Sequence, residues 1–178
     1  MTGNITYDAR RMFKHACAFT DCAYFCEREP NSVVVRTQWY TVPDIVNSAF
    51  ACEVFIKSLL VYYGVRIEDI KRCGHGLVSL WTTLKNKDAE LTNAVESSIL
   101  TYFNTKREDF FAEMLGYISD AFETWRYIYE GHGAKINRIF LCSFRDCLRN
   151  ACCMKLYNMT WHEFVSGDIS WSTSDEDN

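Results

Sequence analysis

The stretch AFACEVFIKSLLVYYG, residues 49–64, decides the fold. Its apolar residues recur every three or four positions, which is the spacing of one face of an α-helix. Pro43 precedes it at a position that suits a first helical turn, and Gly64 is of a type that commonly ends a helix. We therefore expect a long helix from just after Pro43 to about Tyr63. Its predicted apolar face consists of Ile45, Ala49, Cys52, Ile56, Leu59, Leu60 and Tyr63.

The same helical spacing dominates the rest of the chain, which holds only two prolines and eight glycines. Helical segments joined by mostly short loops predict an all-α, up-and-down bundle of about five helices. We expect one domain over residues 1–164 and an acidic C-terminal tail over residues 165–178. The further predicted helices lie at residues 7–28, 77–84, 86–103, 107–130 and 134–157.

Composition narrows the class of protein. Hydrophobic residues make up 48% of the chain, which excludes disorder over most of it. A net charge of −4 excludes a globally basic nucleic-acid-binding protein, so an anion site must come from local clustering of charge. Nine cysteines without a C-x-x-C pair indicate reduced thiols instead of a metal centre. No secretory leader is recognisable, and Glu53 and Lys57 interrupt the most apolar segment. We expect a cytoplasmic protein with no membrane span, metal or cofactor.

Charged residues fall close to the predicted apolar faces. Glu53 and Lys57 lie one turn apart on the central helix, and Arg126 and Glu130 are spaced likewise at the end of the segment 107–130. Ionisable groups near a packed surface lose hydration unless they are paired. Two interpretations remain open: a structural network of ion pairs, or a polar pocket between helices that binds a ligand.

Basic residues recur on one side of the last long helix at Lys135, Arg138, Arg145 and Arg149. This ridge either contacts phosphate groups or is a solvated face without a partner.

His75 stands just before a predicted helix. It either caps or orients the loop, or it takes part in catalysis.

Three pieces of the sequence together resemble the HEPN superfamily of small helical bundles: AFACEVFIKSLLVYYG, then GHGLVSLWTTL at residues 74–84, then FETWRYIYEG at residues 122–131. They span about half of the chain. The resemblance implies a bundle of about five helices that is usually dimeric and common in prokaryotic toxin–antitoxin and phage-defence systems. Many members are metal-independent endoribonucleases, in which an arginine and a histidine separated by four to six residues act at the dimer interface.

Arg126 and His132, with five residues between them, meet that spacing. A guanidinium can stabilise charge on a phosphate, and an imidazole can exchange a proton with the reacting oxygens of RNA. The sequence departs from the family pattern at Tyr127, where nuclease members usually carry a polar residue, and at Gly131 inside the spacer. The alternative is that the pair only marks a helix end, with Arg126 bridged to Glu130 or Glu53.

The resemblance therefore predicts an RNA- or nucleotide-binding protein that forms a homodimer and acts as a metal-independent endoribonuclease. Arg126 and His132 would be catalytic, and Glu53, Lys57 and Tyr127 would line the pocket. Its protein partner would be an antitoxin or another defence component. The alternative functions are a non-catalytic interaction and dimerisation module and a nucleotide binder in the core of the bundle.

Overall fold

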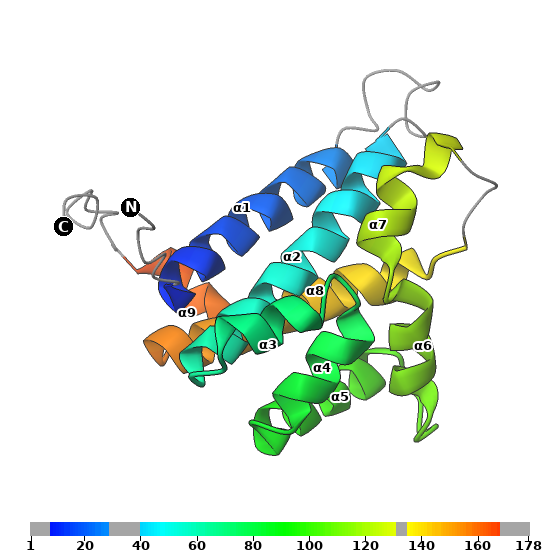
Figure 1. Cartoon of the computed structure of the whole chain (residues 1–178). Coiled ribbons are helices and arrows are strands. Elements are labelled where there is room, and N and C mark those ends of the chain that lie inside the picture. Colours follow the sequence, from blue (N-terminus) through cyan, green and yellow to red (C-terminus); the bar gives the residue numbers. More distant parts are fainter. Residues whose placement is uncertain (1–7, 29–39, 131–134, 168–178) are drawn as a thin grey trace.

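The structure is a computed structural model that describes residues 8–28, 40–130 and 135–167 (Figure 1). All of the regular secondary structure in these ranges is helical, which confirms the all-α class. The helices are α1 (Ala9–Arg28), α2 (Thr41–Tyr62), α3 (Ile67–Arg72), α4 (Leu77–Lys85), α5 (Ala89–Tyr102), α6 (Phe110–Ile118), α7 (Ala121–Arg126), the 3-10 helix η3 (Ile128–Glu130), α8 (Arg138–Tyr157) and α9 (Trp161–Ser166).

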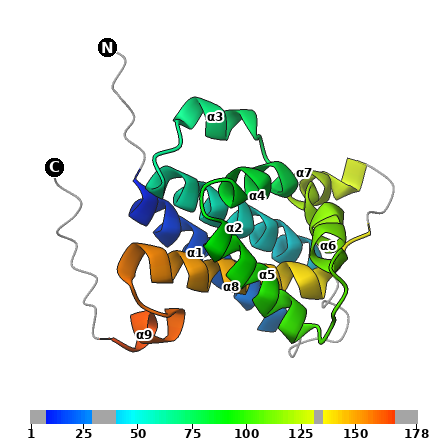
Figure 2. The same ribbon diagram turned by 90° about the horizontal axis from the view of Figure 1, so that it is seen from below.

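Helix α2 is the central element. It packs against α1, α3, α4, α7 and α8, and α1 runs antiparallel beside it (Figures 1 and 2). Because neighbours surround it on several sides, its buried residues are not confined to one narrow stripe. It is the one described helix that is long and apolar enough to cross a membrane, but 61% of its most apolar window is buried inside the protein. That burial is typical of the core helix of a soluble fold.

The end of α2 follows from its sequence, as expected. Gly64 adopts φ of +68°, a left-handed conformation that glycine tolerates better than other residues. Its N–H donates to the carbonyl of Val61 at 2.9 Å, and the N–H of Val65 donates to the carbonyl of Leu60 at 3.0 Å. The left-handed conformation of Gly64 thus allows these backbone hydrogen bonds to form and to end α2.

The expected single helix over residues 107–130 is wrong. This segment forms α6, α7 and η3, with the first break at Ser119 and Asp120. The Ser119 carbonyl accepts a hydrogen bond from the N–H of Leu77 at 3.1 Å, and the Ser119 hydroxyl accepts one from the N–H of Val78 at 3.2 Å. Ser119 therefore satisfies the free N–H groups at the start of α4 instead of continuing its own helix.

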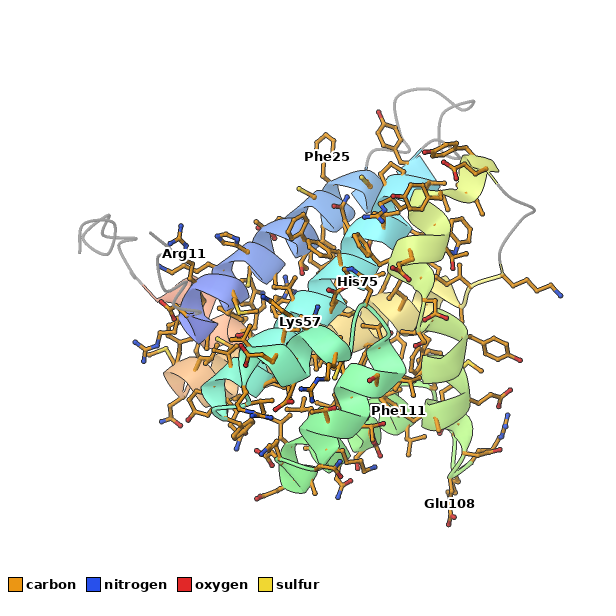
Figure 3. The ribbon with its side chains drawn as sticks, viewed as in Figure 1. Arg11, Phe25, Lys57, His75, Glu108 and Phe111 are labelled. Atoms are coloured by element: carbon orange, nitrogen blue, oxygen red, sulfur yellow. The ribbon has the colours of Figure 1, made fainter. Side chains whose placement is uncertain are left out.

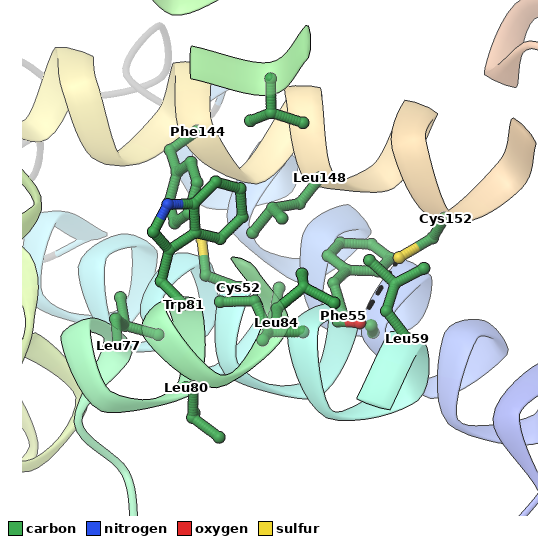
Figure 4. Packing of buried hydrophobic residues seen from close by; sticks show 14 of the residues in the cluster. Cys52, Phe55, Leu59, Leu77, Leu80, Trp81, Leu84, Phe144, Leu148 and Cys152 are labelled. Atoms are coloured by element: carbon green, nitrogen blue, oxygen red, sulfur yellow. Dashed lines mark hydrogen bonds between the residues drawn. The ribbon is translucent and has the colours of Figure 1, made fainter. Parts of the chain in front are cut away.

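Aromatic side chains fill the core where α4, α6 and α8 meet. The ring centroids of Trp81 and Phe144, both labelled in Figure 4, are 5.3 Å apart. Those of Phe111 and Phe144 are 5.6 Å apart. Further along α8, the buried Cys152 thiol donates to the carbonyl of Phe55 on α2 at 3.4 Å (Figure 4). Buried apolar side chains of the helices from α1 to α9 belong to a single hydrophobic cluster.

The number of helices differs from the expectation of about five. The short helices α3 and α9 were not predicted as separate elements, and the segment after residue 107 contributes α6, α7 and η3. Of the predicted acidic tail, residues 165–167 are described, and residues 168–178 lie outside the described ranges.

Candidate functional site

A buried carboxylate on α2 holds a half-exposed imidazole in the turn before α4. Glu53 is only 2% exposed, and its Oε1 accepts a hydrogen bond from the Lys57 ammonium at 2.8 Å. The His75 Nδ1 atom lies 3.0 Å from Oε1 and 2.9 Å from Oε2 of the same carboxylate. Because a carboxylate only accepts, Nδ1 is the donor in these contacts. The predicted network of charges on α2 is therefore present, and it extends to His75 in the turn before α4.

The three side chains differ strongly in exposure. The Glu53 side chain is 3% exposed, that of Lys57 is 18% exposed and that of His75 is 41% exposed. Lys57 and His75 thus link the buried carboxylate to the surface between α2 and α4 (Figure 3). Burial of Glu53 would be costly without these two partners, since an unpaired buried charge loses its hydration.

Arg126 ends α7 and is exposed. Its guanidinium carbon lies 4.9 Å from the ring centroid of Phe122 and 4.5 Å from that of Tyr127. The expected alternative, a bridge from Arg126 to Glu53 or Glu130, is not found: within the described ranges no carboxylate lies in ion-pair range of this guanidinium. Arg126 is held by two aromatic rings and keeps its hydrogen-bond donors free among those residues.

Phe122 connects the two parts of the site. Its ring centroid lies 5.3 Å from that of His75, and the same ring lies beneath the guanidinium of Arg126. Its other neighbour is Phe50 on α2, at 4.7 Å in a stacked arrangement. The structure therefore brings His75 and Arg126 to one aromatic side chain, although 51 positions separate them in the sequence. The spacing of four between Phe122 and Arg126 is a signal for their contact, but nothing local pointed to His75.

The remaining predicted residues of this region lie near the end of α7. Tyr127 is exposed, and its carbonyl accepts a hydrogen bond from the N–H of Glu130 at 2.8 Å. Glu130 is exposed at the end of η3. His132 lies outside the described residues, so its distance from Arg126 stays undetermined.

Of the predicted basic ridge, Lys135 and Arg138 are exposed, whereas Arg145 and Arg149 are buried. Arg145 is 0% exposed and Arg149 is 7% exposed, so neither guanidinium lies on the surface. Arg138 is half-exposed and donates from Nε to the buried carboxylate of Asp44. Both earlier interpretations, a phosphate track and a solvated face, required solvent-exposed arginines. The spacing correctly placed these arginines on one side of α8. However, acidic side chains of α1 and α2 and an aromatic ring of α1 cover that side.

Arg145 forms the centre of this interior network. Its Nη1 donates to Glu27 at 3.0 Å and to the Ser48 hydroxyl at 2.7 Å, and its Nε donates to Asp146 at 3.1 Å. Burial by itself lowers the pKa of Arg145, but the neighbouring carboxylates outweigh burial and raise it above its ordinary value. The tyrosine ring of Tyr24 lies 4.4 Å from the guanidinium carbon. These contacts keep Arg145 charged and fully occupied.

An open pocket of about 510 Å³ lies beside this network. Its lining consists of Glu27, Ser98, Tyr102, Arg138, Ile139, Cys142, Ser143, Arg145, Asp146 and Cys147.

Oxygen or sulfur atoms of Glu27, Asp44 and Cys142 come within 4.8 Å of one another beside the pocket. Both carboxylates are already bound by arginines, and burial raises the pKa of the Cys142 thiol to about 12. A metal ion needs deprotonated, uncommitted donors, so this group is better explained as part of the ion network.

The candidate functional site is therefore the surface around Phe122, whose ring contacts both His75 and Arg126. Comparison with known proteins adds no identification: no protein-family model, no curated protein and no solved structure matches the chain.

Proposed function

We propose that this protein binds RNA through Arg126 and cleaves it without a metal ion, as a HEPN-like endoribonuclease. The observation that carries the proposal is the state of Arg126, which is exposed and stacked on two rings without a carboxylate partner among the described residues. A guanidinium fixed in this way can bind a phosphate oxygen through two parallel hydrogen bonds. It can also stabilise the charge that develops on phosphorus during cleavage.

Three further parts of the proposal rest on the sequence resemblance. His132 acts as general acid or base, Glu53, Lys57 and Tyr127 surround the substrate, and the active protein is a homodimer. It works in the prokaryotic cytoplasm with an antitoxin or another defence component as its protein partner. Nine free cysteines fit a reducing compartment.

A cleavage assay in the presence of a metal chelator tests the proposal. Labelled RNA oligonucleotides are incubated with the wild type, Arg126→Ala and His132→Ala. We expect Arg126→Ala to lower both RNA affinity and cleavage at least tenfold, and His132→Ala to lower cleavage by about 100-fold or more while affinity is retained. Arg107→Ala is the control, because Arg107 is an exposed arginine in the loop between α5 and α6. RNA cleavage by Arg126→Ala and His132→Ala at the wild-type rate would contradict the assignment.

The non-catalytic interaction module remains a second candidate because of two exposed tyrosines. Tyr127 is 45% exposed and Tyr129 is 77% exposed, and their ring centroids lie 6.4 Å apart. Exposed tyrosines are enriched at protein interfaces. Light scattering on Tyr129→Ala decides this case: under the module hypothesis the variant loses self-association, and the wild type neither binds nor cleaves RNA.

A further inference from the structure

We infer that Tyr129 is the residue on which the Arg126 site stacks a nucleobase, so that the site selects unpaired RNA over duplex RNA. This inference rests on the proposed function and names the form of RNA that the same site takes. It uses a tyrosine for which the sequence alone indicated no role.

The ring of Tyr129 is open to solvent. Its exposed fraction of 77% is the largest among the exposed large apolar side chains that the structure describes. Within the described ranges its ring contacts only that of Tyr127, at 6.4 Å between centroids and 62° between ring planes. Such an edge-to-face contact covers at most one face of the Tyr129 ring, so the other face is free to stack on a flat ligand.

A short turn holds this ring in place. Tyr129 is the middle residue of η3, and the N–H of Glu130 donates to the carbonyl of Tyr127 at 2.8 Å. This hydrogen bond closes the turn that carries Tyr129 and fixes its backbone to the end of α7. A tyrosine ring on a fixed backbone loses little conformational freedom when a ligand binds, which makes it an effective contact surface.

Arg126 adjoins the same two rings. Its guanidinium carbon lies 4.5 Å from the centroid of Tyr127, which is the ring that Tyr129 contacts. The guanidinium is therefore no farther from the Tyr129 centroid than 4.5 Å and 6.4 Å combined. Each nucleotide extends a strand by about 3.4 Å or more, so a few nucleotides can place a phosphate on Arg126 and a base on Tyr129.

The charge of the protein makes a contribution from stacking necessary. The net charge is −4, and the exposed acids Glu123 on α7 and Glu130 on η3 add negative charge near Arg126. A single guanidinium neutralises about one phosphate and gives only weak, salt-sensitive binding. Stacking of a base on an aromatic ring requires no positive charge and can supply the remaining affinity.

Duplex RNA cannot use an exposed ring in this way. In a duplex, neighbouring bases cover both faces of each base, and proteins recognise the phosphates and the 2′-hydroxyls instead. A single strand presents base faces, and a tyrosine ring accepts any of the four bases. We therefore expect selection of unpaired segments with little preference for their sequence.

Fluorescence anisotropy tests the inference with a short labelled RNA, used as a single strand and annealed to its complement. All its sugars carry 2′-O-methyl groups, which prevent cleavage during the measurement. We expect the wild type to bind the single strand at least tenfold more tightly than the duplex. Tyr129→Ala and Tyr129→Leu should each lose about tenfold or more of the affinity for the single strand, and Tyr129→Phe should retain it. Tyr102→Ala is the matched control, because Tyr102 is a 66% exposed tyrosine at the end of α5.

The salt dependence separates the stacked base from the phosphate contact. For single strands, the logarithm of affinity falls with the logarithm of salt concentration with a slope of about −0.7 for each contacted phosphate. Arg126→Ala should make this slope shallower by about 0.7. Tyr129→Ala should lower the affinity equally at every salt concentration and leave the slope unchanged.

The outcomes separate this inference from the proposed function. If the wild type binds RNA, Arg126→Ala binds it more weakly and folded Tyr129→Ala binds it as tightly as the wild type, the inference is wrong and the function stands. Equal affinity of the wild type for single strand and duplex also overturns the inference. Light scattering on the same samples shows whether Tyr129 acts through subunit contacts: loss of RNA affinity only together with loss of self-association assigns it to an interface and overturns the inference. If the wild type binds neither form of RNA, both proposals fail.

Discussion

The guanidinium of Arg145, which is 0% exposed, donates from Nη1 to Oε1 of Glu27 at 3.0 Å and so joins α8 to α1. A fully buried arginine is unusual, because its hydration is lost on folding and must be replaced by hydrogen bonds. Ser48 on α2 donates to the Asp44 carboxylate at 3.3 Å and accepts from Arg145 at 2.7 Å. Three helices thus meet at one buried charged side chain.

We predict that Arg145→Ala lowers the free energy of unfolding by about 3–5 kcal/mol, because truncation leaves a cavity at a fully buried position and removes the ion-pair partner of Glu27. Arg145→Met, which fills more of the volume with apolar atoms, should cost less. Urea denaturation measures both changes. Arg138→Met is the control on the same helix, and its effect should be smaller because Arg138 is half-exposed. RNA affinity should be unchanged in folded Arg145→Met. Equal stability of wild type and Arg145→Ala would contradict the network.

Asp88 is predicted to make stability depend on acid pH. Burial tends to raise its pKa, but hydrogen bonds from Leu91, Lys155 and Tyr63 outweigh burial and lower it from 3.8 to about 2. The carboxylate is therefore favoured in the folded state, and its contribution is complete above pH 4 and is lost as the pH falls towards 2. That contribution is on the order of 1 kcal/mol after allowance for solvent screening.

The comparison of wild type with Asp88→Asn measures this contribution. The difference in unfolding free energy should be largest at pH 5–7 and should shrink between pH 4 and pH 2. Asp21→Asn, an exposed aspartate on α1, should show no such trend. A stability difference for Asp88→Asn that is the same at pH 2.5 and pH 6 would argue against the assigned ion pair.

The cysteines should differ strongly in reactivity. All nine are free thiols. Burial raises the pKa of the Cys17 thiol to about 12 and that of Cys153 to about 11, whereas Cys22 is exposed. Since the thiolate is the nucleophile, iodoacetamide at pH 8 should modify Cys22 first and should reach Cys17 and Cys153 only after unfolding. Peptide mass spectrometry over time gives the order, and labelling of Cys17 as fast as Cys22 would disprove it.

The helical segments were largely predictable because their signals are local. The apolar spacing of residues 49–64 and the stop at Gly64 gave the central helix, and the caps of α5 and α8 lie within a few residues of their starts. Spacing also placed Arg138, Arg145 and Arg149 on one side of α8. It could not show that α1 and α2 would cover that side, because burial depends on which elements pack together. The prediction of a ridge was therefore correct in placing these arginines on one side of α8, but wrong in the expected exposure of Arg145 and Arg149.

The candidate site was only partly predictable for a related reason. The pair Glu53 and Lys57 is four residues apart and visible in the sequence, but its link to His75 spans 22 positions. The contact of His75 with Phe122 depends on the break that starts α7. The apolar spacing of the segment does not predict that break. The reason is that Ser119 bonds to the start of α4, where Val78 is 41 positions earlier in the chain.

Ser119→Ala tests whether this tertiary cap sets both the helix break and the site. The substitution removes the hydroxyl that accepts from the N–H of Val78 but keeps the carbonyl that accepts from Leu77. Loss of a helix cap typically lowers stability by about 0.5–2 kcal/mol, and the exposed edge of α4 favours the lower half of that range. Ser98→Ala is the matched control, since the hydroxyl of the exposed Ser98 only donates to the Ala94 carbonyl within α5. Because Ser119 holds the turn that carries His75, amide hydrogen exchange at Leu77 and Val78 should accelerate in Ser119→Ala and stay unchanged in Ser98→Ala. Unchanged protection at Val78 in the folded variant would mean that the start of α4 is held by packing alone, and the break in the segment 107–130 would then need another cause.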